Sequence, residues 1–138
     1  MTPTAPELLN GCVAALSTPP SAEEAGAFAT GKVAIAAMLD ALAAQECATG
    51  SAARVWENAA IRAVLADAAA RYHTAAEDLG DGDYSLAALD SANAELRRRL
   101  IRLHEAVEAA HDTTLDRRIL ALYREMAAHR MLHLPGQG

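Results

Sequence analysis

The chain has 138 residues and a net charge of -6, and roughly a quarter of its residues are alanine. Alanine is the best helix former and strand-forming residues are scarce, so the composition excludes a β-sandwich or a β-barrel. It also lacks the apolar β-branched runs that a parallel α/β fold requires. An apolar fraction of 52% argues against disorder, and the length fits one domain over residues 1–138.

Two helices are predicted in the first third of the chain. A short one runs from Glu7 to about Leu16, and a second follows a capping serine, Ser21, and runs to about Cys47. Side chains spaced by three and four residues form one seam along the second helix, namely Phe28, Gly31, Ile35, Met38, Leu42 and Gln45. The residues Thr49-Gly50-Ser51 are predicted to end this helix.

Three further helices are predicted after this break. They run to about Asp78, from about Ser85 to Ala110, and from the turn at residues 111–114 to about Leu132. Short connections favour antiparallel neighbours. We therefore expect an all-α fold, an antiparallel helical bundle of four main helices plus a short N-terminal helix.

The last two predicted helices carry the most regular pattern in the chain. The first of them has a seam that alternates spacings of three and four without a miss, at Leu86, Leu89, Asn93, Leu96, Leu100, Leu103, Val107 and Ala110. The second continues with Leu115, Ile119, Leu122, Met126, His129 and His133. If the two form a hairpin, facing residues have numbers that add to 225 or 226. This register places Asn93 opposite His133 and Leu96 opposite His129.

Polar residues at the open end of this seam have two interpretations. They form either a hydrogen-bonded layer that fixes the register of the helices or a pocket for a ligand or a reaction, because buried polar groups need partners. The candidate pocket residues are Asn93, Arg97, His129, Arg130, His133, Trp56, Asn58 and Tyr72. The arginines favour a small anionic ligand if a pocket exists. The acidic net charge and the length of the helix argue against nucleic-acid binding.

Two sets of histidine and glutamate residues are candidates for metal binding. Glu125, His129 and His133 share one helix face, and His104, Glu108 and His111 form a second set about 25 Å away at 1.5 Å per residue. The pattern of a di-metal carboxylate bundle, with Glu-x-x-His on two helices, is absent. We therefore expect no metal and no cofactor.

These observations favour an interaction protein over an enzyme. Alanine buries little apolar area per residue, and small domains with thin cores often gain burial by association, so we expect a homodimer or another protein partner. The alternative is a small enzyme or ligand-binding module with its pocket at the Asn93/His129/His133 end.

The short apolar runs and the two widely spaced cysteines favour a cytoplasmic protein without a membrane span. The seam from Asn93 to His104 is typical of many small bacterial helical proteins and indicates no family.

Overall fold

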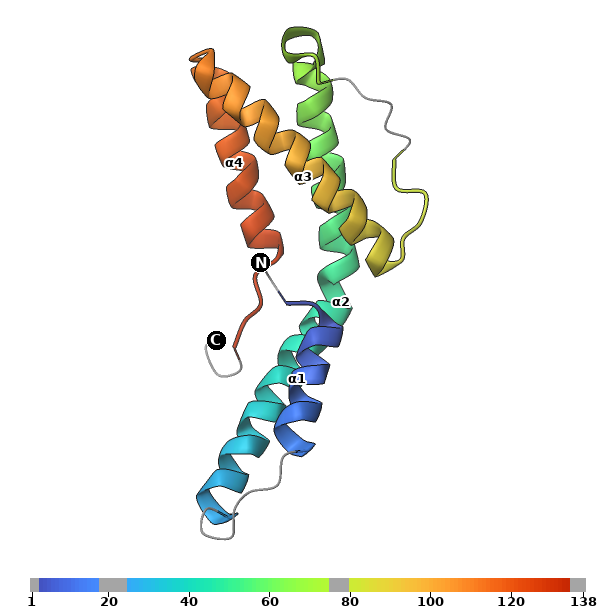
Figure 1. Ribbon diagram of the computed structural model, residues 1–138, viewed down its shortest axis with the longest axis vertical. Coiled ribbons are helices and arrows are strands. Elements are labelled where there is room, and N and C mark those ends of the chain that lie inside the picture. The colour runs from blue at the N-terminus through green and yellow to red at the C-terminus, as the bar shows by residue number, and fades with distance from the viewer. Residues whose placement is uncertain (1–2, 18–24, 75–79, 135–138) are drawn as a thin grey trace. The chain divides into compact units, whose positions relative to one another are not determined.

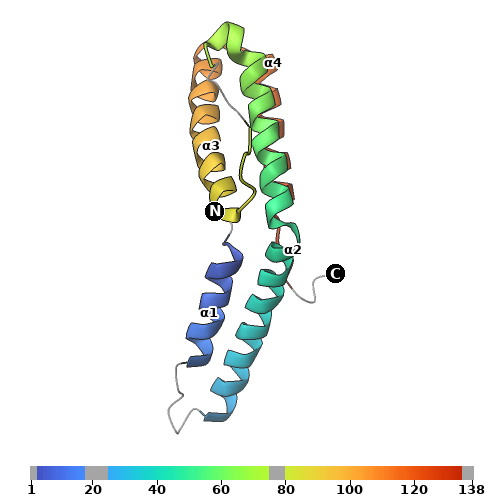
Figure 2. The same cartoon turned by 90° about the vertical axis from the view of Figure 1, so that its right-hand side faces the viewer.

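Every regular element that the structure describes is an α-helix. The computed structural model describes residues 3–17, 25–74 and 80–134. Its helices are α1 (Ala5–Ser17), α2 (Ala25–Tyr72), α3 (Leu86–Ala109) and α4 (Thr113–His129), shown in Figures 1 and 2. The all-α class expected from the composition is confirmed.

Helix α2 corrects the predicted break at residues 49–51. The chain stays helical through Gly50 to Tyr72, so one helix of 48 residues replaces the two that were predicted. Glycine inside a helix costs only about 1 kcal/mol relative to alanine, and the flanking turns are rich in alanine. Thr49 stays in the helix with its hydroxyl donating to the carbonyl of Gln45, at 3.0 Å.

Helix α2 also ends earlier than predicted. Its last residue is Tyr72, and His73 follows in the left-handed region with a φ of 52°. The hydroxyl of Thr74 then donates to the carbonyl of Leu65, at 2.6 Å. The predicted end near Asp78 and the predicted cap at Ser21 lie outside the described residues.

Contacts divide the chain into two compact units, which are described separately. Unit 1 comprises residues 1–50 and 131–138, and unit 2 comprises residues 51–130. Unit 1 therefore contains α1 and the first part of α2, whereas unit 2 contains the rest of α2 together with α3 and α4.

The core of unit 2 follows the seam predicted for the last two helices. Helices α3 and α4 pack against each other, and the second part of α2 completes the core. The buried residues of this core are Ile61, Val64, Leu65, Ala68, Leu96, Leu100, Leu103, Val107, Ile119, Leu122 and Met126. The predicted facing pairs 107/119, 103/122 and 100/126 consist of residues that all lie in this core, whereas the pairing itself stays a prediction.

Side-chain caps position the start of α3 and of α4. Ser85 is the N-cap of α3 and accepts from the backbone N–H of Ala88, close to the predicted start of this helix. Asp112 is the N-cap of α4 and accepts from the backbone N–H of Leu115. Helix α4 ends at His129 rather than near Leu132. Because the helix ends earlier, His133, one of the candidate pocket residues, is not part of it.

Unit 1 has a small core and a large apolar surface. Ala5, Leu8 and Ala43 form its buried cluster, against which Leu39, Leu42 and Leu132 pack. The Sγ of Cys12 contacts Asp40 Oδ1 at 3.1 Å, and burial together with this carboxylate raises the pKa of the Cys12 thiol. Among the side chains of α1 and α2 that the structure describes, five larger apolar ones remain exposed, namely Leu9, Val13, Leu16, Val33 and Ile35.

One helix in the described part of the chain is long and apolar enough to cross a membrane. This is the stretch Ala29–Tyr72 of α2, with a mean hydropathy of 1.2 in its most apolar window. No such stretch was expected from the sequence. A core helix of a soluble protein meets the same criterion of length and composition.

Candidate functional site

A buried network of charged and amide side chains lies in unit 2 beside the apolar core. Its members come from α2, from α3, from the segment between them and from the residue that follows α4. We call it the Glu57 network, and it comprises Glu57, Asn58, Arg62, Asp81, Asn93, Arg97 and Arg130.

Glu57 is fully buried and binds two arginines from different parts of the fold. Arg97 Nε donates to Glu57 Oε1 and Arg130 Nε donates to Glu57 Oε2, both at 2.6 Å. Burial alone raises the pKa of the Glu57 carboxyl, but the hydrogen bond from Arg97 and the charges of both arginines outweigh this effect. The pKa of Glu57 therefore lies below its usual value, and the carboxylate is held ionised.

Two asparagines extend the network between α2 and α3. Asn93 Nδ2 donates to Asn58 Oδ1 at 2.9 Å, and Arg130 donates to Asn93 Oδ1 at 3.1 Å. Asn58 Nδ2 in turn lies 3.2 Å from Asp81 Oδ1 and 3.4 Å from the carbonyl of Leu89. Both amide side chains are thus hydrogen-bonded, as buried polar groups need to be.

Asp81 reaches the network from the segment before α3. It accepts from Arg62 at 2.9 Å, and this hydrogen bond is the largest cause that lowers the pKa of the Asp81 carboxyl. Gly80 precedes it with a φ of 80°, a conformation that glycine adopts without strain. Neither Glu57 nor Asp81 was among the predicted site residues. In the sequence, Glu57 is visible only as an acidic residue next to Asn58, and Asp81 only as an acidic residue in a glycine-rich segment.

Trp56 and His129 stack at the edge of the network. Their ring centroids are 3.9 Å apart and the ring planes are inclined by 23°. His129 is exposed at the last residue of α4, so its ring covers one face of the half-buried indole. The structure thus brings six of the eight candidate residues to one end of unit 2.

His129→Ala is expected to change the fluorescence of Trp56, the only tryptophan of the chain. Removing the stacked imidazole exposes one indole face to water, so emission shifts to longer wavelength, with a stability loss of about 1 kcal/mol or less. Emission spectra of the folded proteins measure the shift. His111→Asn, in the turn before α4, is the control and leaves the spectrum unchanged. Identical spectra for His129→Ala and the wild type would contradict the stacked geometry.

His133 does not continue α4, so the helical register that paired it with Asn93 does not extend to this residue. Because α4 ends at His129, His133 lies beyond the helix and belongs to unit 1. There its backbone N–H donates to Gln45 Oε1 at 2.9 Å, and its carbonyl accepts from Gln45 Nε2 at 2.8 Å. Asn93 binds Asn58 and Arg130 instead.

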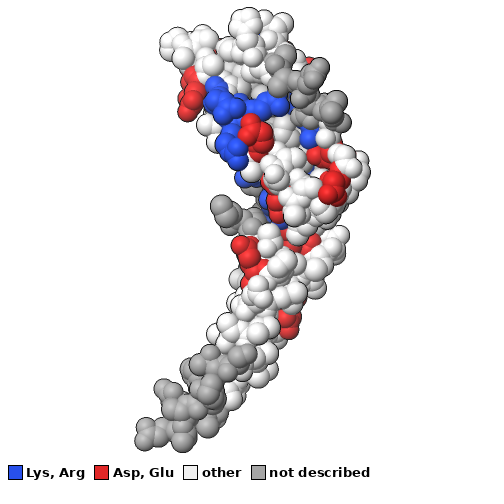
Figure 3. Space-filling view, turned by 45° about the vertical axis from the view of Figure 1, so that its right-hand side comes forward, with Lys and Arg blue, Asp and Glu red and all other residues white. Residues whose placement is uncertain are grey.

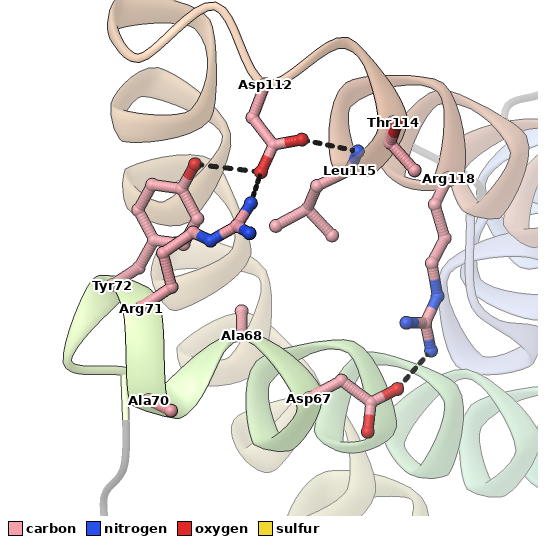
Figure 4. Close-up of a pocket in the computed structure, with 9 residues that line it drawn as sticks. All are labelled: Asp67, Ala68, Ala70, Arg71, Tyr72, Asp112, Thr114, Leu115 and Arg118. Atoms are coloured by element: carbon pink, nitrogen blue, oxygen red, sulfur yellow. Dashed lines mark hydrogen bonds and ion pairs between the residues drawn. The ribbon is translucent and has the colours of Figure 1, made fainter.

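Tyr72 lies at the other end of the unit 2 core, beside a pocket of about 520 Å³ (Figure 4). Its hydroxyl donates to Asp112 Oδ2 at 3.1 Å, and Arg71 donates to the same oxygen. Burial and the nearby Asp112 raise the pKa of Tyr72. Across the pocket, Arg118 pairs with Asp67 at 2.6 Å. The charged groups around this pocket are therefore paired with one another.

The same pairing extends over the surface of unit 2. Arg98 pairs with Glu95 at 2.5 Å, and Arg102 lies 3.9 Å from the same side chain. On the face shown in Figure 3, basic and acidic side chains lie next to each other. Arg98 and Arg102, like Arg97 and Arg130 of the Glu57 network, thus have a carboxylate partner within the chain.

Comparisons with known proteins add no assignment. The chain matches no protein-family model, no curated protein and no solved structure.

Proposed function

We propose that the chain is a non-enzymatic interaction or accessory protein that forms a homodimer through unit 1. The observation that carries this proposal is the set of exposed apolar side chains on both helices of that unit. Val13 has 63% of its surface exposed, Val33 61% and Leu16 58%. Fully burying one such side chain contributes roughly 1.5–3 kcal/mol, so a partner that covers several of them gains substantial free energy.

Helix α1 has two apolar faces. Ala5, Leu8 and Cys12 are buried, whereas Leu9, Val13 and Leu16 are exposed at spacings of four and three. Such spacings place the exposed residues in one row along the helix. A hairpin of two helices covers only one face of each helix, which leaves this row for a partner.

The first part of α2 also has exposed apolar side chains. Ile35 belongs to the seam predicted for this helix, yet half of its surface is exposed. Met38 and Leu42 of the same seam are only partly buried, and the side chain of Phe28 lies outside the described set. A seam that stays open within one chain favours a second helix pair as its cover.

A second copy of this chain is the partner that these features favour. Two-fold symmetry pairs a surface with itself, so an uncharged apolar row meets an equally apolar row without burying an unpaired charge. On the face shown in Figure 3, the described surface of unit 1 is mostly free of charged side chains. The proposal also includes the predicted antiparallel bundle, with α2 as one helix and with helix pairs from two copies as neighbours.

The mass of the protein in solution tests this proposal. Light scattering at micromolar concentration is expected to give twice the 14.5 kDa of one chain. Val13→Glu places a charge in the exposed row and is expected to return the mass to that of one chain, because an unpaired buried charge is costly. Ala14→Glu is the matched control, since Ala14 is exposed on α1 but points about 100° away from Val13. A folded wild-type monomer, or a Val13→Glu dimer, would overturn the proposal.

The alternative function has less support. An enzyme or ligand-binding module at the Asn93/His129 end, including one for a small anion, needs polar groups that are open to a ligand. Glu57, Asn58 and Asn93 are instead bonded to other side chains of the chain itself. This arrangement favours the interpretation of these residues as a layer that fixes helix register.

A further inference from the structure

Three possible metal ligands meet near the turn between α3 and α4. His104 Nε2 lies 2.9 Å from Asp116 Oδ1 and 3.9 Å from Glu108 Oε1. The ligand atoms of all three side chains lie within 4.8 Å of one another. This cluster belongs neither to the Glu57 network nor to the exposed face of unit 1.

The helical hairpin explains why these residues meet. His104 and Glu108 are four residues apart on α3 and therefore share one face. Asp116 lies in the first turn of α4, whose start is fixed by the Asp112 cap. The predicted set combined His104 and Glu108 with His111. In the structure His111 is in the turn with a φ of 54°, and Asp116 takes the third position.

The imidazole is held in place, whereas one carboxylate keeps the freedom to move. The side chain of His104 is only 16% exposed, and the ring of Tyr123 packs on it with centroids 5.6 Å apart. Glu108 is 65% exposed and can rotate. Burial, followed by the negative charge of Glu108, raises the pKa of Tyr123, in keeping with a carboxylate close to these rings.

We propose that His104, Glu108 and Asp116 bind one divalent transition-metal ion, with Zn²⁺ as the best match. Zinc takes nitrogen and carboxylate ligands at about 2.0–2.2 Å, so its ligand atoms lie roughly 3–3.5 Å from one another. The 2.9 Å and 3.9 Å separations bracket this range, and a small rotation of Glu108 closes the longer one. Imidazole favours zinc over Mg²⁺ or Ca²⁺, which prefer oxygen ligands.

This site is independent of dimer formation. It uses two helices of unit 2 alone, so a monomeric chain would bind the ion equally well. Three protein ligands leave a fourth tetrahedral position for water or for a group from a partner. The ion would also link α3 to α4 and raise the melting temperature, because it binds the folded chain in preference to the unfolded one.

Calorimetric titration of the chelator-treated protein with Zn²⁺ tests the proposal. We use Cys47→Ser as the parent, because Cys47 is an exposed free cysteine and cysteine thiolates are zinc ligands. The parent is expected to bind one Zn²⁺ per chain. His104→Ala and Asp116→Asn should each weaken binding by at least about tenfold, the lower limit of what losing even an outer-shell partner of a metal costs.

Two controls separate ligation from folding. His111→Asn removes an exposed imidazole of the same hairpin, and asparagine tolerates its left-handed backbone, so Zn²⁺ affinity stays unchanged. Asp116→Asn keeps an amide that can hydrogen-bond to His104, and its melting curve without metal is expected to match that of the parent. Failure of the parent to bind Zn²⁺ would overturn the proposal. Equal affinity of parent and His104→Ala, or equal loss in His111→Asn, would also overturn it.

Discussion

Replacing Glu57 with glutamine is expected to lower the free energy of unfolding by about 3 kcal/mol. Breaking a buried ion pair by removing one partner costs about 3–5 kcal/mol, because the other charge stays buried. Here the substitution leaves both Arg97 and Arg130 without a carboxylate, although Arg97 is partly exposed and recovers some hydration. Glutamine has nearly the same shape, so the loss reports charge rather than packing. Urea unfolding followed by circular dichroism measures it.

Glu95→Gln is the matched control for Glu57→Gln. Glu95 is also a helical glutamate paired with arginine, but more than half of each side chain is exposed. Exposed pairs contribute roughly 0.2–1 kcal/mol, so this variant should lose little stability. Equal losses for the two variants would show that the Glu57 network does not stabilise unit 2.

The wild type and Glu57→Gln should also differ in how their free energy of unfolding depends on pH in acid. The pKa of Glu57 is lowered from its ordinary 4.5 in the folded chain, so its stabilising effect is complete above pH 4.5. That effect is lost as the pH falls from 4.5 through the folded pKa, because the unfolded chain binds the proton first. The free energy of unfolding should therefore fall more steeply below pH 4.5 for the wild type than for Glu57→Gln. Parallel curves would contradict the direction of the pKa shift.

Leu100→Ala is expected to lower the free energy of unfolding by about 2–5 kcal/mol. Leu100 is fully buried in the core of unit 2, where residues of all three helices of the unit meet. Truncating it loses transfer free energy and leaves a cavity that close-packed neighbours fill only partly. Thermal or urea unfolding gives the size of the loss.

Ile101→Ala provides the comparison at the next residue of the same helix. Ile101 is 51% exposed and lies off the seam, and alanine is a better helix former, so the change in stability should stay within about 0.5 kcal/mol. A larger loss from Ile101→Ala than from Leu100→Ala would mean that α3 faces its neighbours through a different side.

The sequence predicted the part of the fold that local spacing controls. The seam of α3 and α4 depends on residues three and four positions apart, and these share a face in any helix. On α2, Ile61, Leu65 and Ala68 form a stripe at spacings of four and three residues, and they likewise lie in the core of unit 2. A regular period over several turns is enough to identify such a face.

The ends of the helices and the burial of Glu57 could not be predicted in this way. Whether Gly50 ends a helix depends on a difference of about 1 kcal/mol, which the alanines around it outweigh. The end of α4 at His129 removed His133 from the expected site. Glu57 lies beside the stripe, where a charged residue is normally solvated. Its burial depends on Arg97 and Arg130, which are distant in the sequence.

The double ion pair of Glu57 has a consequence for how this sequence can diverge. A change at Glu57 leaves Arg97 and Arg130 without this carboxylate, and a change at either arginine leaves the carboxylate with only one of the two arginines. Single substitutions there carry a heavy penalty, whereas joint replacement by apolar residues of similar volume is nearly neutral. Descendants of this chain should therefore keep Glu57, Arg97 and Arg130 together or exchange them together. Such linked changes at distant positions would identify homologues whose overall sequence identity to this chain is low.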